Sequence, residues 1–235
     1  MSGLGPVELV VFDVDGTLQD TFQWWPRVVR AGVARCAELW GFEPELPDDE
    51  TACAVVGQRD ADVWAPFLPE AYRDRWTELR EVVVPIEVAE LNSGRDYLYP
   101  GIRELLGHLR QLGVRVALAS NCRSRYFSAV CDGLGLRDLS DWQFCLDSNG
   151  GCCKAEMVEF ALEAAGTRRA VMVGDREPDQ EAARAAGIPF IVRVHPRWSL
   201  DGVDGRWHGD PDELLGLLGL PRISCDGFEE VDPGR

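Results

Sequence analysis

The most constraining feature of this sequence is the stretch of residues 7–21, which reads VELVVFDVDGTLQDT. Its apolar and β-branched first half, interrupted only by Glu8, is typical of a strand buried on both faces of a parallel sheet. Two aspartates, Asp13 and Asp15, end the apolar run. Because open α/β sheets bind ligands at the carboxyl ends of their strands, the stretch predicts a site at the tip of a central strand.

The spacing of the two aspartates favours a metal site. Residues i and i+2 of an extended segment point to the same side, so both carboxylates can face one small volume. Mg²⁺ suits that volume, since it binds one or two protein carboxylates and bridges to phosphate. Gly16 lets the backbone approach a ligand closely, and Thr17 offers a hydroxyl donor. A strand followed by a polar turn explains an isolated Asp-x-Asp equally well, so the rest of the chain has to decide.

The overall charge excludes several classes of partner. The 235 residues include 40 acidic and 24 basic side chains, a formal net charge of −16, and no cluster of lysines and arginines. Nucleic acid and anionic membranes are therefore not expected as partners. With no signal peptide or long apolar run, we expect a cytoplasmic protein with reduced thiols. Cys152 and Cys153 lack any C-x-x-C or Cys/His grouping and are interpreted as partly buried thiols.

The remaining chain predicts an α/β fold with an insertion. Residues 22–95 show helical patterns and no buried strand, whereas apolar strands at 114–119, 142–146, 170–173 and 189–194 alternate with helices, the last at 211–218. We expect a Rossmann-like three-layer core with a parallel sheet (1–20 and 97–222), an inserted all-helical cap (21–96) and a flexible acidic tail (223–235). Pro85 should break or kink a helix of the cap.

Polar groups follow four segments of the predicted core, either at a strand tip or at the start of the next helix. A lysine at a helix start is slightly unfavourable, because it meets the positive end of the helix dipole, and so suggests an anion in front of it. Four such groups at one sheet edge predict a shared site. They are Asp13 with Asp15, Ser120 with Asn121, Lys154, and Asp175 with Asp179.

These residues resemble the haloacid dehalogenase-like hydrolase superfamily, in its phosphatase branch with a helical cap after the first strand, similar to phosphoglycolate phosphatases and β-phosphoglucomutases. The matching segments are DVDGTLQDT at 13–21, ALASN at 117–121, Lys154 opening a helix, and VGDREPDQEAARAAGI at 173–188. The resemblance implies an enzyme, a phosphoric monoester hydrolase that uses Mg²⁺ and acts on a small phosphorylated metabolite.

The resemblance also implies a role for each residue. Asp13 would attack phosphorus and form an aspartyl-phosphate, while Asp15 would act as acid and base. Mg²⁺ would be held by Asp13, the backbone carbonyl of Asp15, and Asp175, with Asp179 in its second shell. The phosphoryl group would be bound by Gly16, Thr17, Ser120, Asn121 and Lys154. Arg59 in the cap is a candidate contact for a second anionic group of the substrate.

Two alternatives stay open beside hydrolysis. The same chemistry could end in transfer to a sugar hydroxyl, making the protein a phosphomutase, or the fold could serve a non-catalytic binding protein. Asp15 argues against a dehalogenase, because dehalogenases of this superfamily lack an acid/base aspartate at that position. Lys154 is followed by Ala155 instead of the K-P-x-P of many relatives, which weakens assignment to either the phosphoglycolate phosphatases or the sugar phosphomutases.

Overall fold

The computed structural model describes residues 6–223 and contains a six-stranded sheet in which every pairing is parallel. The strand order is β3-β2-β1-β4-β5-β6. The strands are β1 (Leu9–Phe12), β2 (Arg115–Ser120), β3 (Trp142–Cys145), β4 (Ala170–Gly174), β5 (Phe190–Arg193) and β6 (Gly205–Trp207). This arrangement confirms the predicted α/β class.

Strand β1 lies at the centre of the sheet, and all four of its residues are fully buried. Its last residue, Phe12, pairs in register with Leu118 of β2 and Val173 of β4. The three strands therefore end almost level, which brings the loops after them to the same edge. This register positions the side chains that follow each strand.

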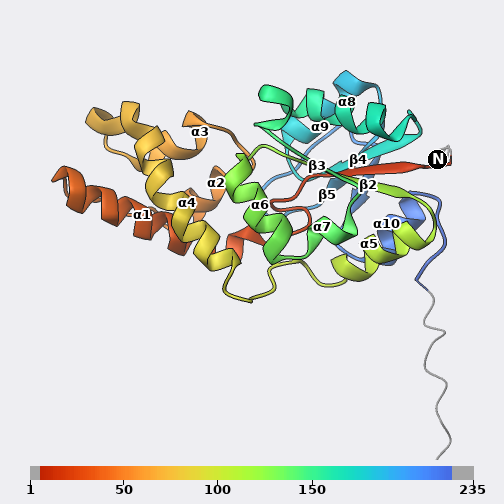
Figure 1. The fold of residues 1–235 in the computed structure, drawn as a ribbon, viewed down its shortest axis with the longest axis horizontal. Helices are drawn as coiled ribbons and strands as arrows, with labels where there is room; N and C mark the ends of the chain where they lie inside the picture. Colours follow the sequence, from red (N-terminus) through yellow and green to blue (C-terminus); the bar gives the residue numbers. More distant parts are fainter. Residues whose placement is uncertain (1–5, 224–235) are drawn as a thin grey trace, which may run out of the picture.

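Helices cover both faces of the sheet, which gives the predicted three-layer core (Figure 1). On one face lie α8 (Lys154–Ala165) and α9 (Glu177–Ala186), which pack with many alanines against the sheet. On the other lie α5 (Ile102–Gln111) and α10 (Pro211–Leu217), with α6 (Ser124–Gly133) and α7 (Leu136–Leu139) beside them.

A separate group of helices lies at one end of the molecule (Figure 1). It comprises α1 (Trp25–Trp40), α2 (Asp49–Ala54), α3 (Ala61–Trp64) and α4 (Trp76–Leu91), together with 3-10 turns at Thr21–Gln23, Ala65–Phe67 and Glu70–Arg75. We call these helices the helical lobe. Helices α1 and α4 approach closely at Gly32, where a side chain would collide with Val83.

Three features differ from the sequence-based expectations or fall outside them. Helix α4 continues through Pro85 without a break, because its apolar face is held by packing against α1 and α6. Strand β6 is absent from the sequence-based expectations, since it is only three residues long and lies among glycines and aspartates. The predicted flexible tail at 223–235 lies, after Ile223, outside the described residues.

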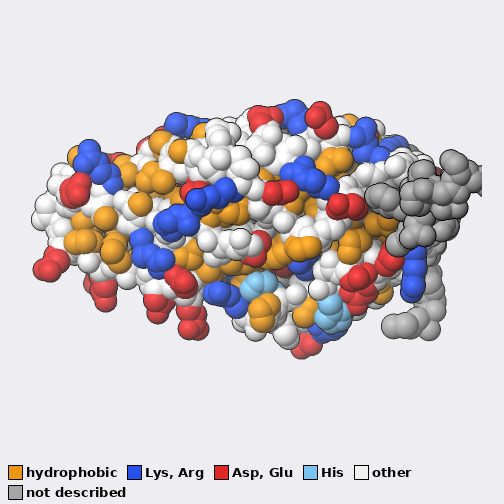
Figure 2. Space-filling model, turned by 90° about the horizontal axis from the view of Figure 1, so that it is seen from below, with side chains coloured by type: hydrophobic (Ala, Val, Ile, Leu, Met, Phe, Trp, Pro, Cys, Tyr) orange, Lys and Arg blue, Asp and Glu red, His pale blue; other side chains and the backbone are white. Residues whose placement is uncertain are grey.

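The described surface carries charged side chains of both signs (Figure 2). Acidic and basic side chains are interspersed over the face seen in Figure 2. Within residues 6–223, no helix has the combination of length and apolar character that a membrane crossing requires.

Candidate active site

The loop after β1 brings its backbone against the carboxylate that follows β4. The backbone N–H of Asp13 donates to the carbonyl of Val173 (2.9 Å) and so extends the pairing of β1 with β4 by one residue. Gly16 then adopts a φ of 83°. A Cβ on Gly16 would lie 2.6 Å from Asp175 Oδ2, so only glycine fits both the backbone conformation and the space.

Three carboxylates, those of Asp13, Asp175 and Asp179, gather at the ends of β1 and β4. One oxygen from each lies within 4.8 Å of the others, and the residues are only 3%, 1% and 1% exposed. Asp175 Oδ2 is buried and has no hydrogen-bond partner among the described residues. A buried set of carboxylate oxygens with one left unsatisfied fits a hard divalent cation such as Mg²⁺.

Lys154 provides the one positive charge inside this group of described carboxylates. Its Nζ lies 2.6 Å from Asp13 Oδ1 and 2.6 Å from Asp179 Oδ1. The anions expected in front of this helix start are thus carboxylates of the chain itself. Burial alone would lower the pKa of Lys154, but Asp13 and Asp179 outweigh it and raise that pKa, so the lysine is charged.

Burial acts in the opposite sense on the carboxylates. It raises the pKa of Asp13 to about 7, although Lys154 opposes the shift, and it raises the pKa of Asp175 well above its ordinary value, with the charge of Asp13 adding to the effect. The carboxyl group of Asp179 is fixed in position by the backbone: its Oδ2 accepts hydrogen bonds from the N–H groups of Asp175 (3.1 Å) and Arg176 (3.0 Å).

The side chain of Asp15 is held apart from this cluster. Its Oδ1 accepts hydrogen bonds from Gln19 Nε2 (2.5 Å), Thr21 Oγ1 (2.6 Å) and the hydroxyl of Tyr126 (2.6 Å). Gln19 also donates to the Tyr126 hydroxyl (2.7 Å). Three donors on one oxygen fix the carboxyl group and leave Oδ2 outside this network, while Asp15 lines the neighbouring cavity.

That cavity, of about 100 Å³, lies between the core and the helical lobe. Asp13, Asp15, Ser120 and Asn121 line its core side. The lobe contributes apolar and polar side chains and a glycine: Trp25, Val55, Val56, Gly57, Gln58, Asp60, Val63, Trp64, Arg80, Val84 and Glu87. A small molecule in the cavity would therefore contact both parts of the chain.

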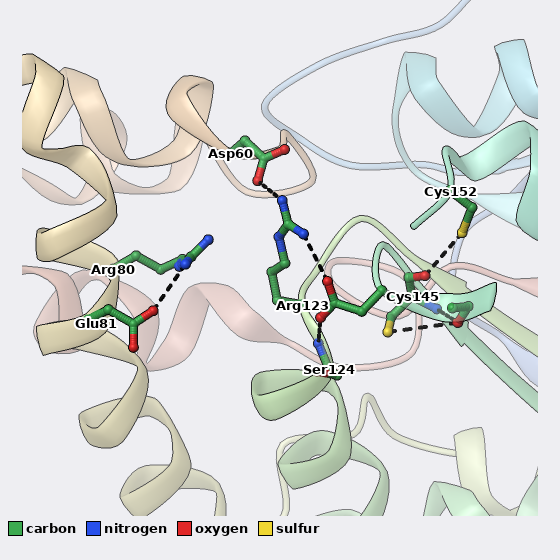
Figure 3. Close-up of polar contacts among 9 residues, drawn as sticks. Asp60, Arg80, Glu81, Arg123, Ser124, Cys145 and Cys152 are labelled. Carbon is green, nitrogen blue, oxygen red and sulfur yellow. Dashed lines mark hydrogen bonds and ion pairs between the residues drawn. The ribbon is translucent and has the colours of Figure 1, made fainter. Parts of the chain in front are cut away.

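Polar contacts join the lobe and the core around this cavity. Arg123, which precedes α6, binds Asp60 of the lobe at 2.7 Å and Asp147 of the core at 2.8 Å, and Arg80 extends from α4 toward the same region (Figure 3). Asn121 Nδ2 donates to the carbonyl of Gly57 (3.3 Å). The lobe is thus in contact with the strand-tip residues.

Some predicted site residues lie elsewhere. Arg59 is exposed and does not line the cavity. Gly16 and Thr17 contact Asp175, the Thr17 hydroxyl at 3.4 Å, and are not among the cavity-lining residues. Sequence reasoning missed Tyr126 and Glu87, because a helical pattern does not show which polar residue of a largely buried helix faces a cavity.

Comparisons with known proteins place this geometry in context. A family model described as haloacid dehalogenase-like hydrolase matches residues 7–187. A phosphoglycolate phosphatase from Agrobacterium fabrum is 30% identical over 193 residues, which cover 78% of this chain and 78% of that protein.

Solved structures show the same fold. A haloacid dehalogenase-like family hydrolase from Streptococcus pneumoniae superposes with a TM-score of 0.72 and 19% identity, covering 90% of this chain and 98% of the other. CbbY from Rhodobacter sphaeroides, solved in complex with phosphate, gives a TM-score of 0.67 and 22% identity, covering 91% and 100%.

Proposed function

The chain belongs to the haloacid dehalogenase-like hydrolase family and is an enzyme of its phosphatase branch; on this premise we propose that it hydrolyses a small phosphorylated metabolite with Mg²⁺ through an aspartyl-phosphate intermediate. The observation that carries the proposal is the buried group of Asp13, Asp175 and Asp179 with Lys154 in contact with two of them. In this proposal the group combines a nucleophile, a cation site and a phosphate-binding charge at one sheet edge.

Asp13 is the proposed nucleophile. One of its oxygens is bound by Lys154, so the carboxyl group is fixed in orientation at the edge of the cavity. Its attack on phosphorus would form the aspartyl-phosphate and release the alcohol of the substrate. Asp13, Asp175 and the backbone carbonyl of Asp15 would hold Mg²⁺, with Asp179 behind them. When bound, the ion would neutralise charge on the phosphoryl oxygens.

Asp15 is the proposed general acid and base. Gln19, Thr21 and Tyr126 hold its Oδ1, so Oδ2 would donate a proton to the leaving oxygen. The same oxygen would then take a proton from the water that hydrolyses the intermediate. A fixed carboxyl group favours both steps, because no conformational entropy is lost in orienting it during each turnover.

The phosphoryl oxygens would be bound by donors at the neighbouring strand tips. Ser120 and Asn121 line the cavity beside Asp13. Lys154 has three N–H donors, and its two carboxylate contacts leave one for a phosphoryl oxygen. Gly16 and Thr17 would help to bind the phosphoryl group through the backbone of their loop, and their contacts with Asp175 would hold that carboxylate in place. These positive charges and N–H and O–H dipoles would stabilise the negative charge that spreads over the phosphoryl oxygens during transfer.

We further propose that residues 21–96 act as a cap on a catalytic core formed by 1–20 and 97–222. The contacts of Arg123 with Asp60 and of Asn121 with Gly57 support this division, because they join the two parts at the rim of the cavity. Closure of the cap would exclude bulk water from the phosphoryl group. Arg59 would reach the substrate only after a rearrangement of its loop.

Release of inorganic phosphate from a metabolite panel, with Mg²⁺ and with EDTA, tests the proposal. The panel contains sugar phosphates, nucleotides, an aryl phosphate and phosphoglycolate, the last because of the name of the Agrobacterium relative. We expect release with Mg²⁺ and at least a hundredfold less with EDTA. Equal, negligible release in both arms refutes a phosphatase, and an isomerised sugar phosphate in place of free phosphate selects a phosphomutase.

A further inference from the structure

A buried carboxyl group faces the cavity from the helical lobe and plays no part in the mechanism proposed above. Glu87 lies on α4, is 5% exposed, and lines the cavity together with Asp13 and Asp15. No hydrogen bond or ion pair joins its side chain to another residue in the range 6–223. Its oxygens are not among the fully enclosed side-chain atoms that lack a partner, so they reach the cavity and can bind a ligand there.

The position of Glu87 on α4 follows a helical stripe. Arg80, Val84 and Glu87 have the spacing i, i+4, i+7 and all line the cavity, so this face of α4 forms part of its wall. Trp25 and Trp64 complete the lobe side with largely apolar surface. In such surroundings a hydrogen bond to a polar group of the substrate contributes more to binding than in water, and leaving that group unpaired costs more.

The charges around the cavity disfavour a second anionic group on the substrate. Arg80 is paired with Glu81 at 3.0 Å, and Arg123 is shared between Asp60 and Asp147. Both arginines that line the cavity are therefore paired with carboxylates, and only Nε of Arg123 is left buried without a partner among the described residues. Burial raises the pKa of Glu87 well above its ordinary value, and the charge of Asp15 raises it further. A substrate carboxylate would add negative charge where burial and Asp15 already disfavour it.

We propose that Glu87 determines specificity by hydrogen-bonding a hydroxyl or amino group on the organic part of the phosphomonoester, and that it discriminates against a carboxylate in that place. This inference rests on the proposed phosphatase function. The preferred substrate is then a phosphorylated alcohol or amino alcohol, and phosphoglycolate is a poor one.

Three phosphomonoesters of matched size test the inference: 2-hydroxyethyl phosphate, phosphoethanolamine and phosphoglycolate. Each has two carbons; the second carbon carries a hydroxyl in the first compound and an ammonium in the second, and is itself the carboxylate carbon in phosphoglycolate. We expect kcat/KM of the wild-type enzyme to be at least about tenfold higher for the hydroxyl or the ammonium compound than for phosphoglycolate. Whichever of these two compounds has the higher kcat/KM shows whether Glu87 binds a hydroxyl or an ammonium group. A preference for phosphoglycolate overturns the inference.

Variants of Glu87 separate its role from the general charge of the cavity. In Glu87→Met the selectivity over phosphoglycolate should fall at least about tenfold, mainly through KM for the favoured substrate. Glu87→Gln should keep selectivity for the hydroxyl compound, because an amide also donates and accepts, but lose any preference for the ammonium compound. Glu78→Gln, which removes an exposed carboxylate of the same helix, is the matched control.

The possible failures are distinguishable. Unchanged selectivity in Glu87→Met overturns the role of Glu87 and leaves the proposed phosphatase activity intact. If that variant does not fold, an ammonium preference retained in Glu87→Gln has the same meaning. An equal loss of selectivity in Glu78→Gln also overturns the role of Glu87. Absence of phosphate release from every compound by the folded wild type, with Mg²⁺ present, overturns the proposed function and this inference with it.

Discussion

At the scale of single residues, the unsatisfied oxygen of Asp175 is the clearest mark of a cation site. Its Oδ2 is buried without a hydrogen-bond donor among residues 6–223, while Thr17 approaches the other oxygen at 3.4 Å. Gly16 lies against this carboxylate and leaves no room for a side chain. The glycine of the motif therefore acts on the position of Asp175 as well as on the turn.

A substitution at Gly16 tests this contact. In Gly16→Ala the new Cβ would displace Asp175 Oδ2, so we expect the affinity for Mg²⁺ to fall about tenfold or more, measured by titration calorimetry. Gly113→Ala is the control, because Gly113 has a similar φ of 74° but a Cβ added there would meet no described atom within 4 Å. Equal Mg²⁺ affinity in the two variants would mean that Gly16 acts only through backbone strain.

The raised carboxylate pKa values predict how stability depends on pH and metal. With the pKa of Asp13 raised from 3.8 to about 7, the metal-free folded protein binds more protons than the unfolded chain between these values. Its free energy of unfolding should therefore fall as the pH rises through that window. Mg²⁺ binds the ionised carboxylates, so it should stabilise the protein more at about pH 8 than at about pH 5.

Urea denaturation at the two pH values, each with Mg²⁺ and with EDTA, measures this effect. The difference between the Mg²⁺ and EDTA curves gives the stabilisation by the ion at each pH. The same stabilisation at both pH values, or a larger one at the lower pH, would contradict the assignment of Asp13 and Asp175 as buried carboxylates that bind the metal.

At the scale of elements, the helical lobe meets the core through apolar packing of α4 against α6 and through a few polar contacts near the cavity. Arg123 bridges Asp60 and Asp147, and Arg176 donates to the carbonyl of Ala54 (2.9 Å). The side chains of Arg123 and Asp60 are 42% and 36% exposed, so water and salt screen their attraction. Polar contacts of this strength at the rim of the cavity are compatible with the proposed closure of the lobe over the site.

Removal of the charge at Asp60 tests the contribution of this contact to closure. An exposed ion pair contributes about 0.2–1 kcal/mol, so Asp60→Asn should raise KM about two- to fivefold at low salt and by less at high salt. Asparagine has the same shape as aspartate, so it should keep the backbone conformation at this position, where φ is 49° and ψ is −126°. Glu38→Gln removes an exposed pair within α1 and should leave KM unchanged. An equal KM for Asp60→Asn and the wild type at low salt would show that the pair does not aid closure.

The elements also show how far the sequence can predict the structure. The core strands other than β6 are predictable to within one or two residues, because buried apolar runs have few other interpretations. The parallel order then brings Asp13, Lys154 and Asp175 together. The lobe is predictable only as helical. Glu87 and Tyr126 escape prediction because their direction depends on how α4 and α6 pack, which no local pattern contains.

At the scale of the whole molecule, one sheet edge collects groups that are more than a hundred residues apart in the chain. Lys154 and Asp13 are separated by 141 positions yet are 2.6 Å apart. The chain has a net charge of −16, so a phosphate ester needs local positive charge in order to bind. This lysine and the proposed cation would supply that charge. The fold thus places a buried group of carboxylates, which could hold a cation, beside a cavity that the lobe also lines.

Acid quench of the enzyme during turnover with Mg²⁺, followed by peptide mass spectrometry, tests the central claim most directly. We expect a phosphoryl group on Asp13, more of it in Asp15→Asn when the substrate is an aryl phosphate whose leaving group needs no proton, and none in Asp13→Asn, which should also lose at least a thousandfold in kcat. Phosphate release by Asp13→Asn at the wild-type rate, or a phosphoryl group on another residue, would contradict it.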